Sequence, residues 1–367
     1  MSRYLRLALI VAMCGCASHQ PHAVQATPAS SGHLSISAVG VEPKTVESPN
    51  AVAIRYTLSR PAAVHIDLVD EAGYVSRRLE AGQQPGGAQT VRWDGRDQQG
   101  KPVSAGVYRY VILGESENGE RALSDASTQT GGEELTPRDF NFDKAAGILR
   151  WNLPRAGRVR VRAGIQGFPH LNTLIDWQPL EAGPHQFAWD GRDASKLIDL
   201  ASHPHLQVKL NAYALSDNTI IVRGVLPASP QAGQPAYPPE RFAAAGRTPY
   251  LHARHDRAAC HEAHLTVEFP DAHRTDEAGR PMLAGQVPVR VRVAEEDARH
   301  AVDSRFEMML YEDLTILFEE EDATTPFTFV WDTAKLPPGQ HLLTVNLLTY
   351  DDHYGVATVP VMVEAAS

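Results

Sequence analysis

An internal duplication constrains this chain more than any other sequence feature. The segment Trp93-Asp-Gly-Arg-Asp97 recurs 96 positions later as Trp189-Asp-Gly-Arg-Asp193. Two further aromatic residues, Tyr56 and Trp151, each open a similar run of alternating residues and lie 95 positions apart. Two landmarks that keep the same order and nearly the same offset indicate a repeated structural unit. Because a period near 95 residues suits one small β-sandwich domain of about 100 residues, we expect two such domains in tandem.

Apolar and polar residues alternate along several segments, and no segment has a long apolar period of 3.6 residues. Period-two alternation predicts strands with one face toward a core and the other toward solvent. The apolar positions of three such segments are Val52, Ile54, Tyr56, Leu58, Val159, Val161, Ala163, Ile165, Val289, Val291 and Val293. In two of these segments the polar positions are arginines, namely Arg158, Arg160, Arg162, Arg290 and Arg292. We interpret these arginines as solvated sheet faces, with an anion-binding strip as the alternative.

A third, more divergent copy lies near the C-terminus. Phe329-Val-Trp331-Asp332 repeats the Trp-Asp strand end, and Gly339 precedes an apolar strand as Gly106 does in the first copy. We therefore expect an all-β fold of tandem antiparallel sandwiches that follow a signal peptide and a tether. The expected boundaries are 1–16 for the signal peptide, 17–32 for the polar tether, 33–130, 135–228 and 262–365 for the three sandwiches, and 229–261 for a Pro/Ala/His-rich linker.

The N-terminal segment has the composition of an export signal. Two arginines give it a positive end, and the apolar run from Leu7 to Met13 is too short to span a bilayer. The pair Gly15-Cys16 resembles the lipobox of bacterial lipoproteins, in which a small residue precedes the lipidated cysteine, although Met13 and Cys14 depart from its usual residues. This resemblance implies a lipid anchor at Cys16 without a transmembrane helix. An ordinary secretory signal with incidental cysteines is the alternative.

Charge and cysteine content exclude further classes of protein. The formal net charge of −10 argues against general nucleic-acid binding, because that role needs a basic surface to neutralise phosphates. Cleavage before Cys16 leaves this lipidated residue and Cys260 as the remaining cysteines, so no intrachain disulfide is expected. The sequence has no Gly-x-Ser-x-Gly elbow, phosphate-binding Gly loop or His-Glu-x-x-His motif. We therefore expect that the chain is not an enzyme.

Three segments of the first repeat carry a family resemblance, namely Val64–Gly73, Gly86–Asp97 and Gly100–Tyr108. Together they resemble the immunoglobulin-like domain of flagellar hook-capping (FlgD-type) proteins, and the match covers residues 50–115. The second repeat keeps the Trp-Asp-Gly-Arg-Asp segment but lacks the Gly-Val-Tyr continuation, so it is a degenerate member, and the third is a looser relative. The resemblance implies immunoglobulin-like β-sandwiches, while nothing in the chain resembles a hook cap as a whole.

The repeated motif consists of a tryptophan, an aspartate and, in two copies, a glycine. The tryptophan offers a large apolar ring for a core, the aspartate side chain can bond nearby backbone amides in a turn, and the glycine permits the turn geometry. The motif residues are Trp93, Asp94 and Gly95; Trp189, Asp190 and Gly191; and Trp331 and Asp332. Calcium binding by Asp94 and Asp97 is the alternative, although this spacing offers fewer than the about six to eight oxygens that calcium takes.

One cluster suggests metal chemistry. Four histidines and one cysteine fall within thirteen residues, and they are His252, His255, Cys260, His261 and His264. Imidazole and thiolate are ligands of zinc and copper, so a Zn or Cu site is one hypothesis. The spacing matches neither a known zinc motif nor the Cys-x-x-Cys-His pattern of haem attachment. The alternative is a polar linker without a cofactor, in a chain that contains 16 histidines.

These features predict a non-catalytic lipoprotein of the bacterial cell envelope, anchored in the outer membrane through Cys16. Its sandwiches would act as spacers and bind other envelope or surface proteins, and no nucleic acid. Two further functions stay open, namely metal or redox handling by the His252–His264 cluster and carbohydrate binding on sandwich surfaces. Convergence of the cluster's side chains would favour the first, and exposed tryptophans would favour the second.

Overall fold

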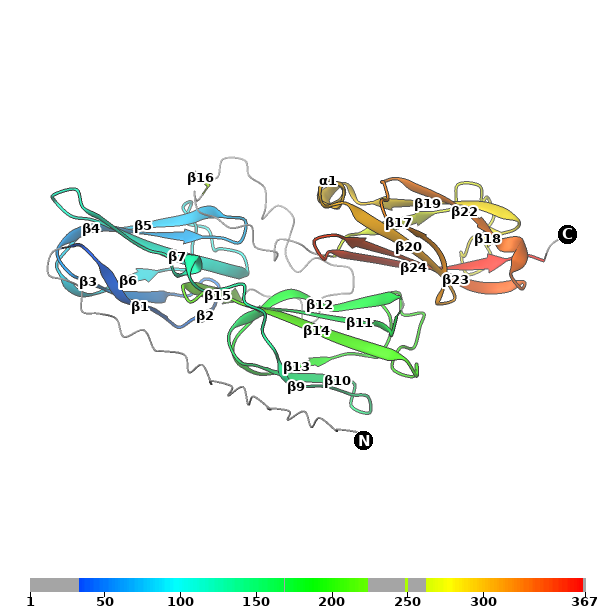
Figure 1. Ribbon diagram of the computed structural model, residues 1–367, viewed down its shortest axis with the longest axis horizontal. Helices are drawn as coiled ribbons and strands as arrows, with labels where there is room; N and C mark the ends of the chain where they lie inside the picture. The colour runs from blue at the N-terminus through cyan, green and yellow to red at the C-terminus, as the bar shows by residue number, and fades with distance from the viewer. Residues whose placement is uncertain (1–32, 168, 224–247, 250–261, 366–367) are drawn as a thin grey trace, which may run out of the picture. The chain divides into compact units, whose positions relative to one another are not determined.

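The computed structural model describes residues 33–167, 169–223, 248–249 and 262–365. This part of the chain is all-β, with three β-sandwiches and one α-helix (Figure 1). Neighbouring strands are mostly antiparallel. Short parallel pairings occur between β2 (Thr45–Glu47) and β15 (Thr219–Arg223) and between β18 (Met282–Leu283) and β24 (Tyr354–Val363). In the described segments, no helix combines the length and the apolar character needed to cross a lipid bilayer.

The first sandwich packs a three-stranded sheet against a larger one. The small sheet has the order β1-β3-β6, with β1 (Ile36–Glu42), β3 (Val52–Leu58) and β6 (Gly87–Trp93). The large sheet has the order β16-β5-β4-β7-β15-β2, with β8 beside β7, and its strands are β16 (Thr248–Pro249), β5 (Tyr74–Gln84), β4 (Ala62–Val69), β7 (Gly106–Glu115), β15 (Thr219–Arg223), β2 (Thr45–Glu47) and β8 (Arg121–Ser124). Tyr56 and Trp93 from the small sheet meet Ile66 and Ile112 from the large one in a single core.

The second sandwich consists of two three-stranded sheets. One has the order β13-β10-β9, with β13 (Gly183–Ala188), β10 (Ile148–Leu153) and β9 (Arg138–Asp143). The other has the order β12-β11-β14, with β12 (His170–Leu180), β11 (Gly157–Ile165) and β14 (Leu206–Ala214). Trp151 and Trp189 pack with Val159 and Val161 of β11 between the sheets. The apolar positions of β11 therefore face the core, as the alternation predicts.

The third sandwich pairs a three-stranded sheet with a five-stranded one. The first has the order β17-β19-β22, with β17 (Leu265–Glu268), β19 (Gln286–Val293) and β22 (Phe327–Asp332). The second has the order β18-β24-β23-β20-β21, with β18 (Met282–Leu283), β24 (Tyr354–Val363), β23 (Gly339–Thr349), β20 (Phe306–Glu312) and β21 (Thr315–Glu320). Its core contains Trp331 and Phe306, both 0% exposed.

Strand β15 differs from the expected division of the chain. It lies in the range 135–228 expected for the second sandwich, yet it pairs antiparallel with β7 and parallel with β2 of the first. Ile220, Ile221 and Val222 of β15 are at most 4% exposed, so the strand completes the first sandwich with backbone hydrogen bonds and apolar contacts. Strand β16, from the range expected as a linker, also pairs with β5 of this sheet. The first sandwich therefore recruits segments that follow the second repeat in sequence.

Helix α1 (Glu295–Ser304) lies between β19 and β20 and was not predicted from the sequence. Ala294 precedes it without a side-chain cap hydrogen bond, although capping residues mark many helix starts. Ala301 is 2% exposed, while the neighbouring Val302 is 54% exposed, so the helix buries one face through small residues and leaves an apolar side chain in solvent. Such a short connecting helix leaves too weak a periodic signal to be recognised in the sequence.

Candidate functional site

The first two copies of the tryptophan motif form the same turn. In the first, the indole Nε1 of Trp93 donates to the Arg96 carbonyl at 2.9 Å, and the Arg96 amide donates to Asp94 Oδ1 at 3.1 Å. In the second, the corresponding bonds join Trp189 to the Arg192 carbonyl at 2.9 Å and the Arg192 amide to Asp190 Oδ1 at 3.0 Å. The intervening glycines, Gly95 and Gly191, have φ values of 72° and 77°, a region that L side chains rarely adopt. These contacts agree with the turn role expected for the motif.

The third copy keeps the buried tryptophan but not the turn. Trp331 is 0% exposed, but the residue after Asp332 is Thr333 in place of glycine. A short 3-10 helix, η4 (Thr333–Lys335), follows instead, and the Thr333 hydroxyl donates to the Gly285 carbonyl at 2.8 Å. Asp332 pairs with exposed Lys335 at 3.0 Å. Because a residue with a Cβ disfavours the positive φ of the other two turns, the chain takes a different path here.

Arg158, Arg160 and Arg162 of β11, here called the arginine strip, are buried. Their exposed fractions are 4%, 3% and 8%. The expectation that they line a solvated sheet face is therefore wrong. Arg292 of β19 is exposed, as expected for a solvated face, and forms an ion pair with Glu268 at 3.3 Å. Alternation along a strand shows which face is polar, but a polar face covered by another domain has the same pattern as one covered by water.

Arg158 of the strip is paired with a carboxylate of the first sandwich. Its Nη2 forms an ion pair with Oε1 of Glu71, and these side chains are 5% and 0% exposed. Glu71 Oε1 also accepts the backbone N–H of Val107 in β7 at 2.9 Å. The Arg158 Nη1 donates to the Trp177 carbonyl at 3.3 Å. A charge on the second sandwich thus meets its counter-charge on the first, away from solvent.

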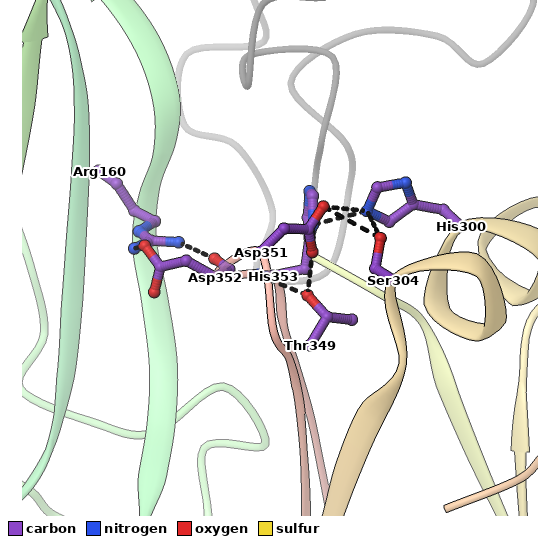
Figure 2. Close-up of polar contacts among 7 residues, drawn as sticks. All are labelled: Arg160, His300, Ser304, Thr349, Asp351, Asp352 and His353. Atoms are coloured by element: carbon purple, nitrogen blue, oxygen red, sulfur yellow. Dashed lines mark hydrogen bonds and ion pairs between the residues drawn. The ribbon is translucent and has the colours of Figure 1, made fainter. Parts of the chain in front are cut away.

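Arg160 is paired with the third sandwich (Figure 2). Its Nη1 donates to the Asp352 carbonyl at 2.6 Å, and its Nη2 pairs with the Asp352 carboxylate. The guanidinium also lies over the Trp177 ring, 4.4 Å from its centroid, and Arg162 lies 3.5 Å from the ring centroid of Tyr354. Burial lowers the pKa of Arg160 from its usual value, Arg162 adds to this effect, and Asp352 opposes it. The carboxylate and the rings compensate a guanidinium that burial disfavours.

A reciprocal pair of hydrogen bonds also joins the second and third sandwiches. The His170 amide donates to Asn346 Oδ1 at 2.8 Å, and Asn346 Nδ2 donates back to the His170 carbonyl at 2.8 Å. The Glu262 amide donates to Asp176 Oδ2 at 2.7 Å. The partners in each contact are separated by at least 86 residues, so no local sequence signal identifies them. The arginine strip and these contacts make β11 and β12 the surface through which the second sandwich meets both others.

Most of the predicted metal cluster lies outside the described residues. This applies to His252, His255, Cys260 and His261, and also to the predicted lipidation site Cys16. His264 is described, and its Nδ1 lies 3.2 Å from Asp297 Oδ2 of α1. The zinc or copper hypothesis for this cluster therefore stays a prediction.

All five tryptophans of the chain are buried. Their exposed fractions do not exceed 5%, and the residues are Trp93, Trp151, Trp177, Trp189 and Trp331. An exposed aromatic ring, on which a sugar can stack, would favour the carbohydrate-binding hypothesis. None of these tryptophans offers such a ring, so the feature that would have favoured carbohydrate binding is missing at these five positions.

Comparisons with known proteins match the first sandwich to a family. The FlgD Ig-like domain family matches residues 43–118. Among solved structures, FlgD from P. aeruginosa is 18% identical, with 34% of this chain and 81% of that chain covered and a TM-score of 0.21. The fibronectin(III)-like modules of Clostridium thermocellum CbhA are 8% identical, with 89% and 95% covered and a TM-score of 0.21. No curated protein matches the chain in sequence. The first sandwich is therefore similar to the FlgD Ig-like domain over residues 43–118.

Proposed function

We propose that this chain is a non-catalytic module of the bacterial cell envelope that spaces and binds other envelope or surface proteins. The observation that best supports this proposal is the arginine strip. Arg158 and Arg160 use their charges to join the second sandwich to Glu71 of the first and to Asp352 of the third. Tandem Ig-like domains that are joined by buried ion pairs are suited to a structural or adhesion-like role.

The two ion pairs of the strip favour a defined contact between domains. A buried ion pair adds little net stability over apolar residues of similar size, because both ions lose their hydration. A misplaced contact, however, would leave a guanidinium buried without its counter-charge, which is strongly unfavourable. We infer that Arg158 and Arg160 select which sandwich surfaces meet. Strand β15 follows the second repeat in the chain and pairs with β7, so it also ties the second repeat to the first sandwich. Contacts of this kind would hold each domain in a defined position relative to the next.

The proposal places the protein at the outer membrane through a lipid on Cys16, with residues 17–32 as a tether. Gly15-Cys16 after a short apolar run supports this placement. The net charge of −10 supports protein partners over nucleic acid. The partners would be envelope or surface proteins that contact the sandwich surfaces.

Changing Cys16 to serine is expected to release the protein from the membrane fraction, because serine cannot take the thioether-linked lipid. Fractionation of cells and intact-mass analysis of the mature protein measure this. Cys14→Ser is the matched control, and it should leave both the fractionation and the lipid-modified mass unchanged. A Cys16→Ser protein that stays in the membrane with the same processed mass would show that no lipid is attached there.

Cross-linking in intact cells, followed by affinity purification and mass spectrometry, tests the binding role. We expect a small, reproducible set of envelope proteins to be captured by the full chain. A matched control carries residues 1–32 fused to an unrelated folded reporter, so that the anchor is retained and the sandwiches are absent. Capture of the same proteins by this control would contradict binding through the sandwiches.

A further inference from the structure

Helix α1 and the turn between β23 and β24 bring three metal-ligating side chains together (Figure 2). His300 comes from α1, and Asp351 and His353 come from the turn. The His300 Nε2 lies 2.8 Å from the His353 Nδ1. Asp351 Oδ2 lies 3.1 Å from His300 Nε2, and its Oδ1 lies 3.1 Å from His353 Nδ1. We propose that His300, Asp351 and His353 bind one divalent transition-metal cation, with zinc as the best match.

The distances within this triad suit a zinc ion. Zinc takes nitrogen ligands at about 2.0–2.1 Å in tetrahedral geometry, so two nitrogens that share it lie roughly 3.3 Å apart. The two imidazole nitrogens at 2.8 Å need to separate by only a few tenths of an ångström to reach this spacing. Two imidazoles and one carboxylate leave a fourth position for water or a further ligand, as in open zinc sites.

The triad without a cation leaves its polar atoms poorly matched. The facing nitrogens of His300 and His353 can share one proton, so one ring donates and the other accepts. Asp351 also places one carboxylate oxygen 3.1 Å from each of these nitrogens. The nitrogen that accepts the shared proton then faces a carboxylate oxygen with no proton between them, because a neutral imidazole carries a proton on only one of its nitrogens. A cation between the three groups gives each of them a favourable partner at once.

Neighbouring groups already hold the triad's ligands in place. The Thr349 hydroxyl donates to Asp351 Oδ1 at 2.5 Å and accepts the His353 backbone N–H at 2.9 Å. The Ser304 hydroxyl, at the end of α1, lies 3.1 Å from Asp351 Oδ2. Outer contacts of this kind orient ligands and support metal affinity. The turn thus presents Asp351 and His353 in fixed positions toward His300.

The pKa values of His353 and Asp351 both lie below their usual ranges. Burial lowers the pKa of His353, although its hydrogen bond with Asp351 opposes this effect. Burial alone would raise the pKa of Asp351, but hydrogen bonds from Thr349 and His353 outweigh it and lower that pKa to about 2. The carboxylate is therefore ionised at neutral pH.

A second group of ligating side chains in the third sandwich is explained without a metal. His341 Nδ1 lies 2.7 Å from Asp313 Oδ2 and 3.2 Å from Glu312 Oε1, and its Nε2 donates to the Pro337 carbonyl at 2.9 Å. A protonated imidazole satisfies all three acceptors, because both ring nitrogens then donate. No such assignment satisfies two facing imidazoles, so the proposal is confined to the triad of His300, Asp351 and His353.

Zinc titration of the full chain tests the proposal. The background protein is the full chain with alanine at four positions of the predicted cluster, namely His252, His255, Cys260 and His261. It is treated with a chelator and purified in detergent. Titration by calorimetry with zinc alone should give one saturable site per chain. His300→Ala should weaken this site by about 10-fold or more, as loss of a ligand exceeds the effect of losing an outer contact. His300 is suited to this test because its side chain is 44% exposed, and the helix should tolerate alanine.

His273→Ala is the matched control, since it removes another exposed histidine of the third sandwich. Its zinc affinity should equal that of the background protein, and Asp351→Asn should behave like His300→Ala. Circular dichroism spectra that match the background protein show that each variant is folded. Absence of saturable zinc binding by the background protein would overturn the proposal, as would an unchanged affinity in the folded His300→Ala variant. This result is independent of the Cys16 anchor and of partner capture.

Discussion

Replacing Trp93 with alanine is expected to destabilise the first sandwich by about 3–5 kcal/mol, the usual cost of removing a large buried aromatic side chain. The Trp93 side chain is 0% exposed and packs on Tyr108, with their ring centroids 5.4 Å apart. Its Nε1 also donates to the Arg96 carbonyl at 2.9 Å. Alanine therefore leaves a cavity between two sheets and removes the hydrogen bond that holds the motif turn. Chemical denaturation followed by circular dichroism measures the loss as a shift of the unfolding midpoint.

Three variants make the Trp93 result specific. Trp93→Phe keeps most of the ring volume but loses the N–H donor, so its loss should be clearly smaller. Trp189→Ala should destabilise the second sandwich by a comparable amount, because Trp189 makes the equivalent bond at 2.9 Å. Gln99→Ala changes an exposed side chain of the same loop and should have little effect. Limited proteolysis with mass analysis identifies which sandwich opens first. An unchanged midpoint for Trp93→Ala would contradict the core role of the motif.

Changing Glu71 to glutamine is expected to cost about 3–5 kcal/mol, because it leaves a buried guanidinium without a counter-charge. The Glu71 and Arg158 side chains are 0% and 5% exposed, so water cannot replace the lost charge. Glutamine keeps the size of the side chain and an oxygen for the Val107 amide, so the loss reports the charge itself. The free energy of unfolding, measured by denaturant titration, is the test.

A second substitution and an exposed ion pair serve as controls for Glu71. Adding Arg158→Met to Glu71→Gln should restore much of the lost stability, because the uncompensated charge is then removed. Glu115→Gln breaks an ion pair with Arg121 whose side chains are 50% and 79% exposed. It should have little effect, since solvent already screens that pair. Equal losses for Glu71→Gln and Glu115→Gln would show that burial of the strip is energetically unimportant.

The core role of the tryptophan and the turn role of the aspartate and glycine could be predicted from the sequence because the interactions of the motif are local, whereas the indole hydrogen bond was not predicted. Trp93 bonds to a carbonyl three residues later, and Asp94 accepts an amide two residues later. The second copy repeats these contacts with Trp189 and Asp190. In the third copy, the absence of glycine after Asp332 was visible in the sequence and corresponds to the change of turn. Hydrogen bonds of this kind depend on few residues, and all of them lie within a few positions of one another in the chain.

The metal-binding triad could not be found by the same means. The sequence drew attention to His252–His264, where potential ligands are close in the chain. In the triad, His300 is separated by about fifty residues from Asp351 and His353, and α1 gave no clear helical pattern. The available signal was the run of three polar residues at 351–353, Asp-Asp-His, which follows a long apolar strand.

Sequence alone was sufficient for the all-β class, the position of the core tryptophans, the motif turns and the apolar faces of the strands. These depend on alternation within one strand or on contacts across a few residues, which a single segment encodes. The folded chain was needed to show that Arg158 and Arg160 are buried, that β15 joins the first sheet, and that His300 meets His353. Each of these depends on which distant surface covers a polar face or edge, and a strand pattern is the same whether its polar face meets water or another domain.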